Sequence, residues 1–144
     1  MTTKFSNSQT IVQRQQYKAI KLGAVPVDLV NKALGRTLVE GRAKLSALAH
    51  QHIAQDHPTD YALVMRALRS VLDAPDYVGH DGFDIPNFYF VRAVSDGAGQ
   101  AHVLVAIAIS PSADGCYRVR SAYSISPATV ANRLGANPPR LHRV

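Results

Sequence analysis

The sequence predicts an α+β fold, in which N-terminal helices precede a mainly antiparallel β-meander of about four strands and a short C-terminal helix. Apolar residues recur at helical spacing in the first half of the chain, whereas strand-length segments separated by turn residues fill the second half. With 144 residues, 47% of them hydrophobic, the chain is long enough for about one domain with its own core. We expect a helical or arm-like segment over residues 1–40 and the main α+β domain over residues 41–144, together forming one compact unit.

The opening of the chain gives weak signals followed by one clear helix. Residues 1–22 are polar and glutamine-rich with a weakly amphipathic pattern, which fits either a helix or a partly ordered arm. Pro26 and Gly35 then bracket a short helix, because proline is favoured at the start of a helix and glycine just beyond its end. Residues 35–45 are ambiguous and contain two short segments that fit extended structure.

Two further helices are expected before the strands. Ser46 is a suitable N-cap for a helix over about residues 47–56. The apolar stripe of this helix would turn His52 toward the core and leave His50 on the far side. A second helix, over about residues 58–73, carries the strongest helical periodicity in the chain.

Three strand-length segments form the expected meander, namely residues 88–94, 101–109 and 117–125. Glycine-containing turn sequences separate them, which is typical of hairpin connections. The middle segment is apolar on both faces and should therefore lie at the centre of the sheet. Residues 127–134 predict a closing helix, followed by a basic tail that contains prolines.

The last of these strands carries most of the candidate binding residues. Strict alternation would put two sets of side chains on opposite faces, Tyr117, Val119, Ser121, Tyr123 and Ile125 on one and Arg118, Arg120, Ala122 and Ser124 on the other. Phosphate contacts could then converge on the face that holds Arg118, Arg120 and Ser124. An ordinary solvated sheet face fits the same pattern.

The charge balance indicates a class of partner. The formal net charge is +6, and the basic side chains concentrate toward the two ends of the chain, with acidic ones in the middle. Both ends would favour a polyanion such as nucleic acid, through phosphate contacts and the release of counterions. The alternative is an ordinary soluble basic protein.

Several classes of protein lose their support from the sequence. The single cysteine, Cys116, excludes an internal disulfide framework and a cysteine-rich zinc site. The longest apolar run, Val103 to Ile109, is far shorter than a membrane helix, and the N-terminus lacks the apolar stretch of a secretory signal. We therefore expect a protein of the cytoplasm, or one delivered into a target cytoplasm, with no membrane contact.

No cofactor or metal is expected either. The sequence has no phosphate-binding glycine loop, no dinucleotide fingerprint and no Gly-x-Ser-x-Gly nucleophile elbow. His52 and His57 are five residues apart, which does not place two metal ligands on one helix face. The remaining chemistry rests on histidine, arginine and hydroxyl groups.

These groups suffice for metal-independent cleavage of RNA. The 2′-hydroxyl of the substrate attacks the adjacent phosphate, so the protein supplies only a general base, a general acid and groups that stabilise the phosphorane. Histidine titrates near neutral pH and can act as base or acid. Arginine presents a permanently charged fork of donors that suits a pentavalent phosphate.

The order of motifs along the chain also favours metal-independent RNA cleavage. The first motif is Leu45-Ser46-x-x-Ala49-x-x-His52-Ile53-x-x-x-His57-Pro58, which precedes an amphipathic helix and then Val71-Leu72-x-x-Pro75-Asp76-Tyr77-Val78-Gly79. An aromatic strand ending in Arg92, an apolar strand, and Tyr117-x-Val119-x-Ser121-Ala122-Tyr123-Ser124-Ile125 follow. Over about residues 43–135 this order resembles the phage-associated branch of the barnase, EndoU, colicin-tRNase and RelE-like nuclease superfamily. The resemblance implies helices followed by a four-stranded antiparallel sheet, RNA cleavage without a metal, and a phage, mobile-element or toxin context.

The resemblance also implies roles for particular residues. His52 matches the helix histidine of the family and His57 the histidine at the helix junction, and either one would act as base or acid. Arg92 falls where the family keeps a basic strand residue, and Ser121 where it keeps a serine or threonine on the last strand, with Tyr123 and Ser124 beside it. In the hypothesis that combines this resemblance with the strand pattern, Arg92 or Arg120 would stabilise the phosphorane, and Ser121 or Tyr123 would orient a phosphate oxygen. Substrate contacts would come from Arg118, Arg120, Tyr123 and Ser124.

The resulting hypothesis is a metal-independent endoribonuclease whose substrate is RNA, with tRNA as one candidate. A toxin of this kind would need an immunity or antitoxin partner with an acidic surface. Two alternatives remain open, a catalytically inactive module that binds nucleic acid and a phage structural or protein-interaction domain. The oligomeric state is not encoded in any of these patterns.

Overall fold

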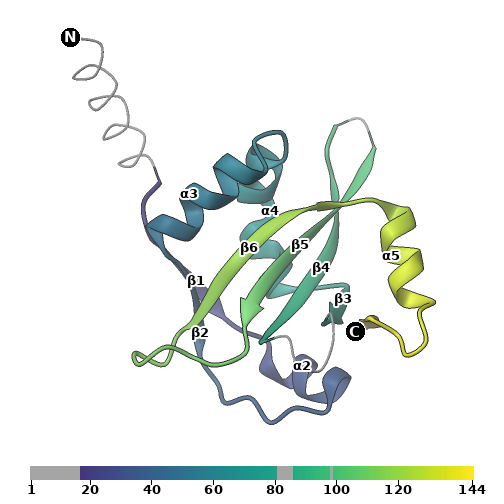
Figure 1. Ribbon diagram of the computed structural model, residues 1–144, viewed down its shortest axis with the longest axis horizontal. Helices are drawn as coiled ribbons and strands as arrows, with labels where there is room; N and C mark the ends of the chain where they lie inside the picture. Colours follow the sequence, from purple (N-terminus) through teal and green to yellow (C-terminus); the bar gives the residue numbers. More distant parts are fainter. Residues whose placement is uncertain (1–16, 81–85, 98) are drawn as a thin grey trace.

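The computed structural model describes residues 17–80, 86–97 and 99–144. Within these ranges the chain forms one seven-stranded mixed sheet and four helices (Figure 1). The strands are β1 (Ile20–Ala24), β2 (Arg42–Leu45), β3 (Tyr77–Gly79), β4 (Asn87–Ser95), β5 (Gln100–Ala108), β6 (Tyr117–Ile125) and β7 (Leu141–Arg143). The helices are α2 (Val27–Leu34), α3 (Ala47–Asp56), α4 (Tyr61–Asp73) and α5 (Pro127–Leu134).

The predicted arrangement of helices followed by a four-strand meander is wrong. The strand order is β1-β2-β6-β5-β4-β3-β7, with β2 parallel to β6 and all other neighbours antiparallel. Strand β1 therefore precedes α2, and β2 lies between α2 and α3. Strands β3 and β7, of three residues each, extend the other edge of the sheet. Such short strands show too little alternation to be recognised, because their conformation depends on pairing with distant segments.

The segment before Pro26 differs most from expectation. The helix or arm predicted over residues 1–22 lies, for its first sixteen residues, outside the described part of the chain. Residues Ile20–Ala24 form β1, which pairs with β2 rather than continuing a helix. Leu22 of β1 and Val30 of α2 are buried in the same cluster as Leu72 of α4, so this segment shares the main core.

Helix α4 is the centre of that core. Val64, Leu68 and Val71 are almost fully buried and recur at the spacing of one helix face, as the sequence predicted. They pack in one cluster with Phe88 and Phe90 of β4. Because α4 contacts β1, β4, β5 and β6, the sheet curls around this helix.

The local signals that mark where helices begin and end act as the sequence predicted. The Ser46 hydroxyl accepts the backbone N–H of Ala49 at 3.1 Å and caps α3. Gly35 ends α2 in the left-handed conformation with φ of 63°, which favours glycine. The strand predicted to be central, β5, lies in the middle of the seven-strand order.

The opposite face of the sheet is covered only in part. Helix α5 packs Val130 there, in a second cluster with Tyr89, Leu104 and Leu141. Its element contacts are with β5 and β7, on the side of the sheet away from β1 and β2 (Figure 1). The outward side chains of β1, β2 and the start of β6 therefore face solvent, and they form the candidate site.

Candidate nucleic-acid interface

A bulge in β6 decides which of its side chains face outward. Ser121 pairs with Ala106, but the next pair along β5 is Ile107 with Val119, so Arg120 is an extra residue in β6. Tyr117 and Val119 are buried in the main core, and so is Ala122. The strict alternation predicted for this strand is therefore wrong, since the bulge reverses the direction of the side chains that follow it.

Three basic residues form a row across the sheet before the bulge. Lys21 of β1 is paired with Lys44 of β2, and Lys44 is paired with Arg118 of β6. Directly paired residues on neighbouring strands present their side chains on the same face. The sequence neighbours of the row, Leu22 and Tyr117, are buried in the core, so the row itself faces outward.

Two more exposed arginines belong to the same strands as this row. Arg42 precedes Lys44 by two positions in β2 and is exposed, and Arg120 is exposed at the bulge. We call the five side chains together the basic face, namely Lys21, Arg42, Lys44, Arg118 and Arg120. Within the described ranges, no ion pair involves any of its members except Lys44.

Asp114, in the loop before β6, is the partner of Lys44. Its Oδ2 accepts from Lys44 Nζ at 2.7 Å, and its Oδ1 accepts the backbone N–H of Cys116 at 2.9 Å. The hydrogen bond from Lys44 and the one from Cys116 lower the pKa of the Asp114 carboxyl. Asp114 therefore stays ionised at neutral pH and offsets one charge of the basic face.

A pair of stacked rings lies farther along β6. His57, the C-cap residue of α3, stacks on Tyr123 with ring centroids 4.9 Å apart and an interplanar angle of 26°. Both side chains are half-buried. Tyr123 is five residues beyond Arg118, which corresponds to about 15 Å along a strand. The basic face and the ring pair are therefore neighbouring features of the same strand.

The junction that carries His57 is fixed to the edge of β6. The Oδ2 atom of Asp60 accepts the backbone N–H of Ser124 at 3.1 Å, and the Asp60 N–H donates to the His57 carbonyl at 3.1 Å. Strand β2 pairs with β6 only at Tyr117 and Arg118, so the later part of β6 has no strand partner on that side. The Asp60 carboxylate thus satisfies an edge N–H and holds the ring of His57 over Tyr123.

The orientation predicted for the histidines of α3 is reversed. His52 is exposed and lines a shallow pocket of about 370 Å³ with Leu48 and Gln51. His50 is only 5% exposed, donates from Nδ1 to the Lys18 carbonyl at 2.9 Å, and accepts at Nε2 from the Tyr61 hydroxyl at 2.6 Å. The spacing of His50, Ile53 and His57 is the signal that could have identified the buried face.

Burial of the Tyr61 ring has an electrostatic consequence. Desolvation, with a smaller effect of the neighbouring Tyr17, raises the pKa of Tyr61. Tyr61 therefore remains a protonated hydroxyl that can donate to His50 over the whole physiological range. The two ring nitrogens of His50 join α3 to the residues just before β1 and to the start of α4, which is a structural role.

Arg92 does not lie near the ring pair. It donates from Nη1 to the Ala74 carbonyl at 2.9 Å and to the Ser70 carbonyl at 3.4 Å, at the C-terminal end of α4. The register places Arg92 opposite Val103, and Val103 opposite Ser124, so Arg92 and Ser124 share the inner face of the sheet. Arg92 therefore stabilises the end of a helix by hydrogen bonds and by its charge.

The structure brings together only part of the predicted site. His57 and Tyr123 are in contact, and Arg118, Arg120 and Ser121 precede Tyr123 on the same strand. The remaining predicted residues lie elsewhere: His52 on the surface of α3, and Arg92 and Ser124 on the inner face of the sheet. Sequence reasoning missed Lys21, Arg42 and Lys44, because nothing in the sequence indicated that β1 and β2 lie beside β6.

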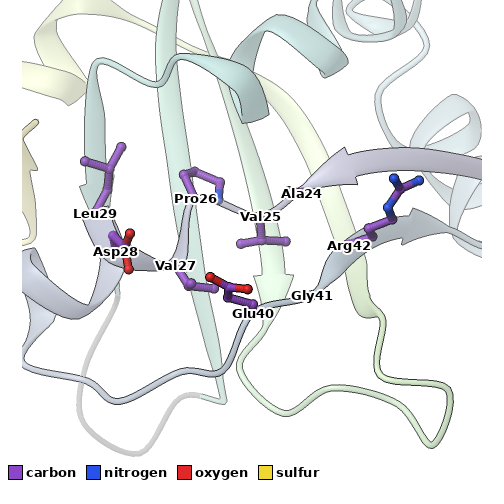
Figure 2. A pocket seen from close by; sticks show the side chains of 9 residues that line it. All are labelled: Ala24, Val25, Pro26, Val27, Asp28, Leu29, Glu40, Gly41 and Arg42. Carbon is purple, nitrogen blue, oxygen red and sulfur yellow. The ribbon is translucent and has the colours of Figure 1, made fainter.

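A pocket adjoins the basic face (Figure 2). It has a volume of about 670 Å³ and lies between the turn from β1 to α2 and the entry into β2. Asp28, Glu40 and Arg42 line it together with apolar residues, and the Arg42 side chain points away from the Glu40 carboxylate (Figure 2). Arg42 thus keeps its charge directed away from the pocket acids.

Two properties of the described residues complete the description. In the part that the structure describes, no group of three or more histidine, cysteine, aspartate or glutamate side chains is placed to hold a metal ion. No helix in the same ranges is long and apolar enough to cross a membrane. Comparisons of the chain with protein-family models, with curated proteins and with solved structures found no match.

Proposed function

We propose that the protein binds nucleic acid through its basic face. The observation that carries this proposal is the row of Lys21, Lys44 and Arg118, which lies across three neighbouring strands with all three side chains directed outward. Neighbouring strands are about 4.8 Å apart, so these charges extend over a surface rather than enclosing one small anion. A polyanion that crosses the strands can contact all of them, with release of its counterions.

The energetics of the row favour a ligand over a purely structural role. Like charges placed directly opposite each other on neighbouring strands destabilise a sheet. The row contains two such pairs, Lys21 with Lys44 and Lys44 with Arg118, and among the described residues only Asp114 offsets them by an ion pair. Stability given up in this way is typical of a binding surface, where the ligand supplies the missing opposite charge.

The test compares charge removal inside and outside the basic face. Binding of a fluorescein-labelled 20-nucleotide RNA is measured by anisotropy at several salt concentrations, for the wild type, Arg118→Gln and the double variant with Lys21→Gln. Each lost phosphate contact should reduce the slope of log K against log salt by about 0.7 for a single strand. Lys32→Gln, on the exposed side of α2, is the matched control and should leave the slope unchanged.

Two results would overturn the proposal. One is weak binding by the wild type at low salt, with no dependence on the salt concentration. The other is an equal loss of affinity in Arg118→Gln and Lys32→Gln, since this would indicate a response to net charge alone rather than to a defined surface.

RNA cleavage is the second candidate function, and the ring pair is the observation that favours it. His57, at the end of α3, lies against Tyr123 of β6, and the same strand carries Ser121 and Arg120, so a base is brought to a strand that supplies hydroxyl groups and a cation. In this reaction His57 would remove the 2′-hydroxyl proton, the 2′-oxygen would attack phosphorus, and Arg120 would stabilise the phosphorane. The 5′-oxygen would leave with a proton from the Tyr123 hydroxyl, giving a 2′,3′-cyclic phosphate.

Cleavage is tested with total cellular RNA in the presence of EDTA. Discrete products with cyclic phosphate ends, lost in a folded His57→Gln variant but retained in His52→Gln, would support the reaction. The His52 variant is the matched control, because His52 is an exposed histidine at the surface of the same helix. Intact RNA with the folded wild-type protein would exclude cleavage of these RNAs and leave the binding function.

A further inference from the structure

We infer that the nucleic acid bound by the basic face is single-stranded and that one of its bases stacks on the ring pair of His57 and Tyr123. This inference rests on the proposed function and specifies its ligand. The ring pair is a ready platform, because its centroids are 4.9 Å apart and its planes are within 26° of parallel. Both side chains are half-buried, so a nucleobase that reaches their exposed surface would continue the stack by one further ring.

The position of the ring pair relative to the charges suits this ligand. Arg118 in the row and Tyr123 in the ring pair lie about 15 Å apart along β6, with exposed Arg120 between them. A backbone that crosses the row at Arg118 can follow β6 past Arg120 and deliver a base to Tyr123. Ser121, on the same face as Tyr123, adds a hydroxyl beside this path.

The shape of the surface favours a single strand over a duplex. The bases of a duplex are already stacked and paired, and its major groove admits a helix or a two-stranded ribbon rather than the face of a sheet. Stacking on an aromatic side chain requires a base that is free of its neighbours, as in single strands, loops and ends. The ring pair would therefore add affinity for single strands but not for duplexes.

The ring pair is held in place before a ligand arrives. The backbone N–H of His57 donates to the Ile53 carbonyl at 3.0 Å, and the bond from Ser124 N–H to the Asp60 carboxylate ties the following turn to β6. Such a pre-positioned ring loses little conformational entropy when a base stacks on it.

The experiment uses a 12-nucleotide oligo-uridine with one 2-aminopurine, its DNA counterpart and a duplex of the same length. Tyr123→Ala should weaken single-strand binding by about 5- to 150-fold and remove the quenching of 2-aminopurine. Tyr123→Phe keeps the ring and should restore most of the single-strand binding that Tyr123→Ala loses. Comparing the affinities for the RNA and DNA strands shows whether the sugar contributes to binding, since stacking involves the base alone.

A second variant guards against a folding defect, because Tyr123 also packs against the smaller buried cluster. His57→Ala should weaken single-strand binding and leave duplex binding unchanged. Single-strand binding unaffected by both alanine variants, while Arg118→Gln weakens it, would overturn the stacking inference alone. If neither the two alanine variants nor Arg118→Gln weakened single-strand binding, the proposed function would be overturned as well.

Discussion

Replacing Arg92 should destabilise the protein without weakening its binding of nucleic acid. Arg92 Nη1 donates to the Ala74 carbonyl at 2.9 Å, just beyond the last turn of α4, where a carbonyl has no partner within the helix. A hydrogen bond to a charged group contributes about 1.5–3 kcal/mol, and a cation at a helix C-terminus about 0.3–1 kcal/mol. The contact to Ser70 is long, at 3.4 Å, and adds little. We therefore expect Arg92→Met to lower the free energy of unfolding by about 2–3 kcal/mol.

Urea denaturation followed by circular dichroism measures this loss. With an m-value of about 2 kcal/mol/M, the midpoint of unfolding should fall by about 1 M urea. The melting temperature should fall by about 10 °C in a protein of this size. Arg66→Met is the matched control, since Arg66 lies on the same helix and makes a single 3.4 Å contact to the Ser95 carbonyl. This control should change the free energy of unfolding by less than about 0.5 kcal/mol.

The opposite pattern would refute this interpretation of Arg92. If Arg92→Met unfolds at the same urea concentration as the wild type but loses binding or cleavage of RNA, then Arg92 contacts the ligand. Arg92→Lys gives a further check, because it keeps the charge but not the fork of donors. It should recover part of the lost stability.

Two other substitutions test the surface and the edge of the sheet. Asp114→Asn removes the charge that pairs with Lys44 at 2.7 Å, so RNA affinity measured by anisotropy at low salt should rise; an unchanged affinity would show that Lys44 does not contact the ligand. Because the pKa of Asp114 is lowered in the folded protein, its contribution to stability is present above the ordinary carboxyl pKa and is lost as the pH falls through the pKa of the folded state. The free energies of unfolding of wild type and Asp114→Asn should therefore become equal in acid. Gly79→Ala would place a Cβ against the Arg140 carbonyl and should destabilise the pairing of β3 with β7 by more than about 2 kcal/mol. Gly99→Ala, with open space around it, should change thermal unfolding little, so equal melting temperatures of the two variants would contradict the close packing at Gly79.

Local signals in the sequence were sufficient for the long elements. Helix α4 and strands β4, β5 and β6 each carry several periods of their apolar pattern, and Ser46 and Gly35 mark helix ends by their own side-chain or backbone chemistry. These features depend on residues within a few positions of one another. The basic residues and the ring-forming residues of the candidate interface were likewise visible as residue types before any fold was known.

The tertiary structure alone decided how these residues are combined. Strand β1 forms because β2 pairs with it, and β2 forms because it lies beside β6, so the row of Lys21, Lys44 and Arg118 has no signature in any one segment. The bulge at Arg120 reversed the side chains that follow it, and no local pattern marked its position. The burial of the two histidines of α3 is the reverse of the prediction, because this helix has too few apolar residues for their spacing to indicate which face is buried. The Lys18 carbonyl and the Tyr61 hydroxyl, which are remote in sequence, supply the hydrogen bonds that hold His50 inside.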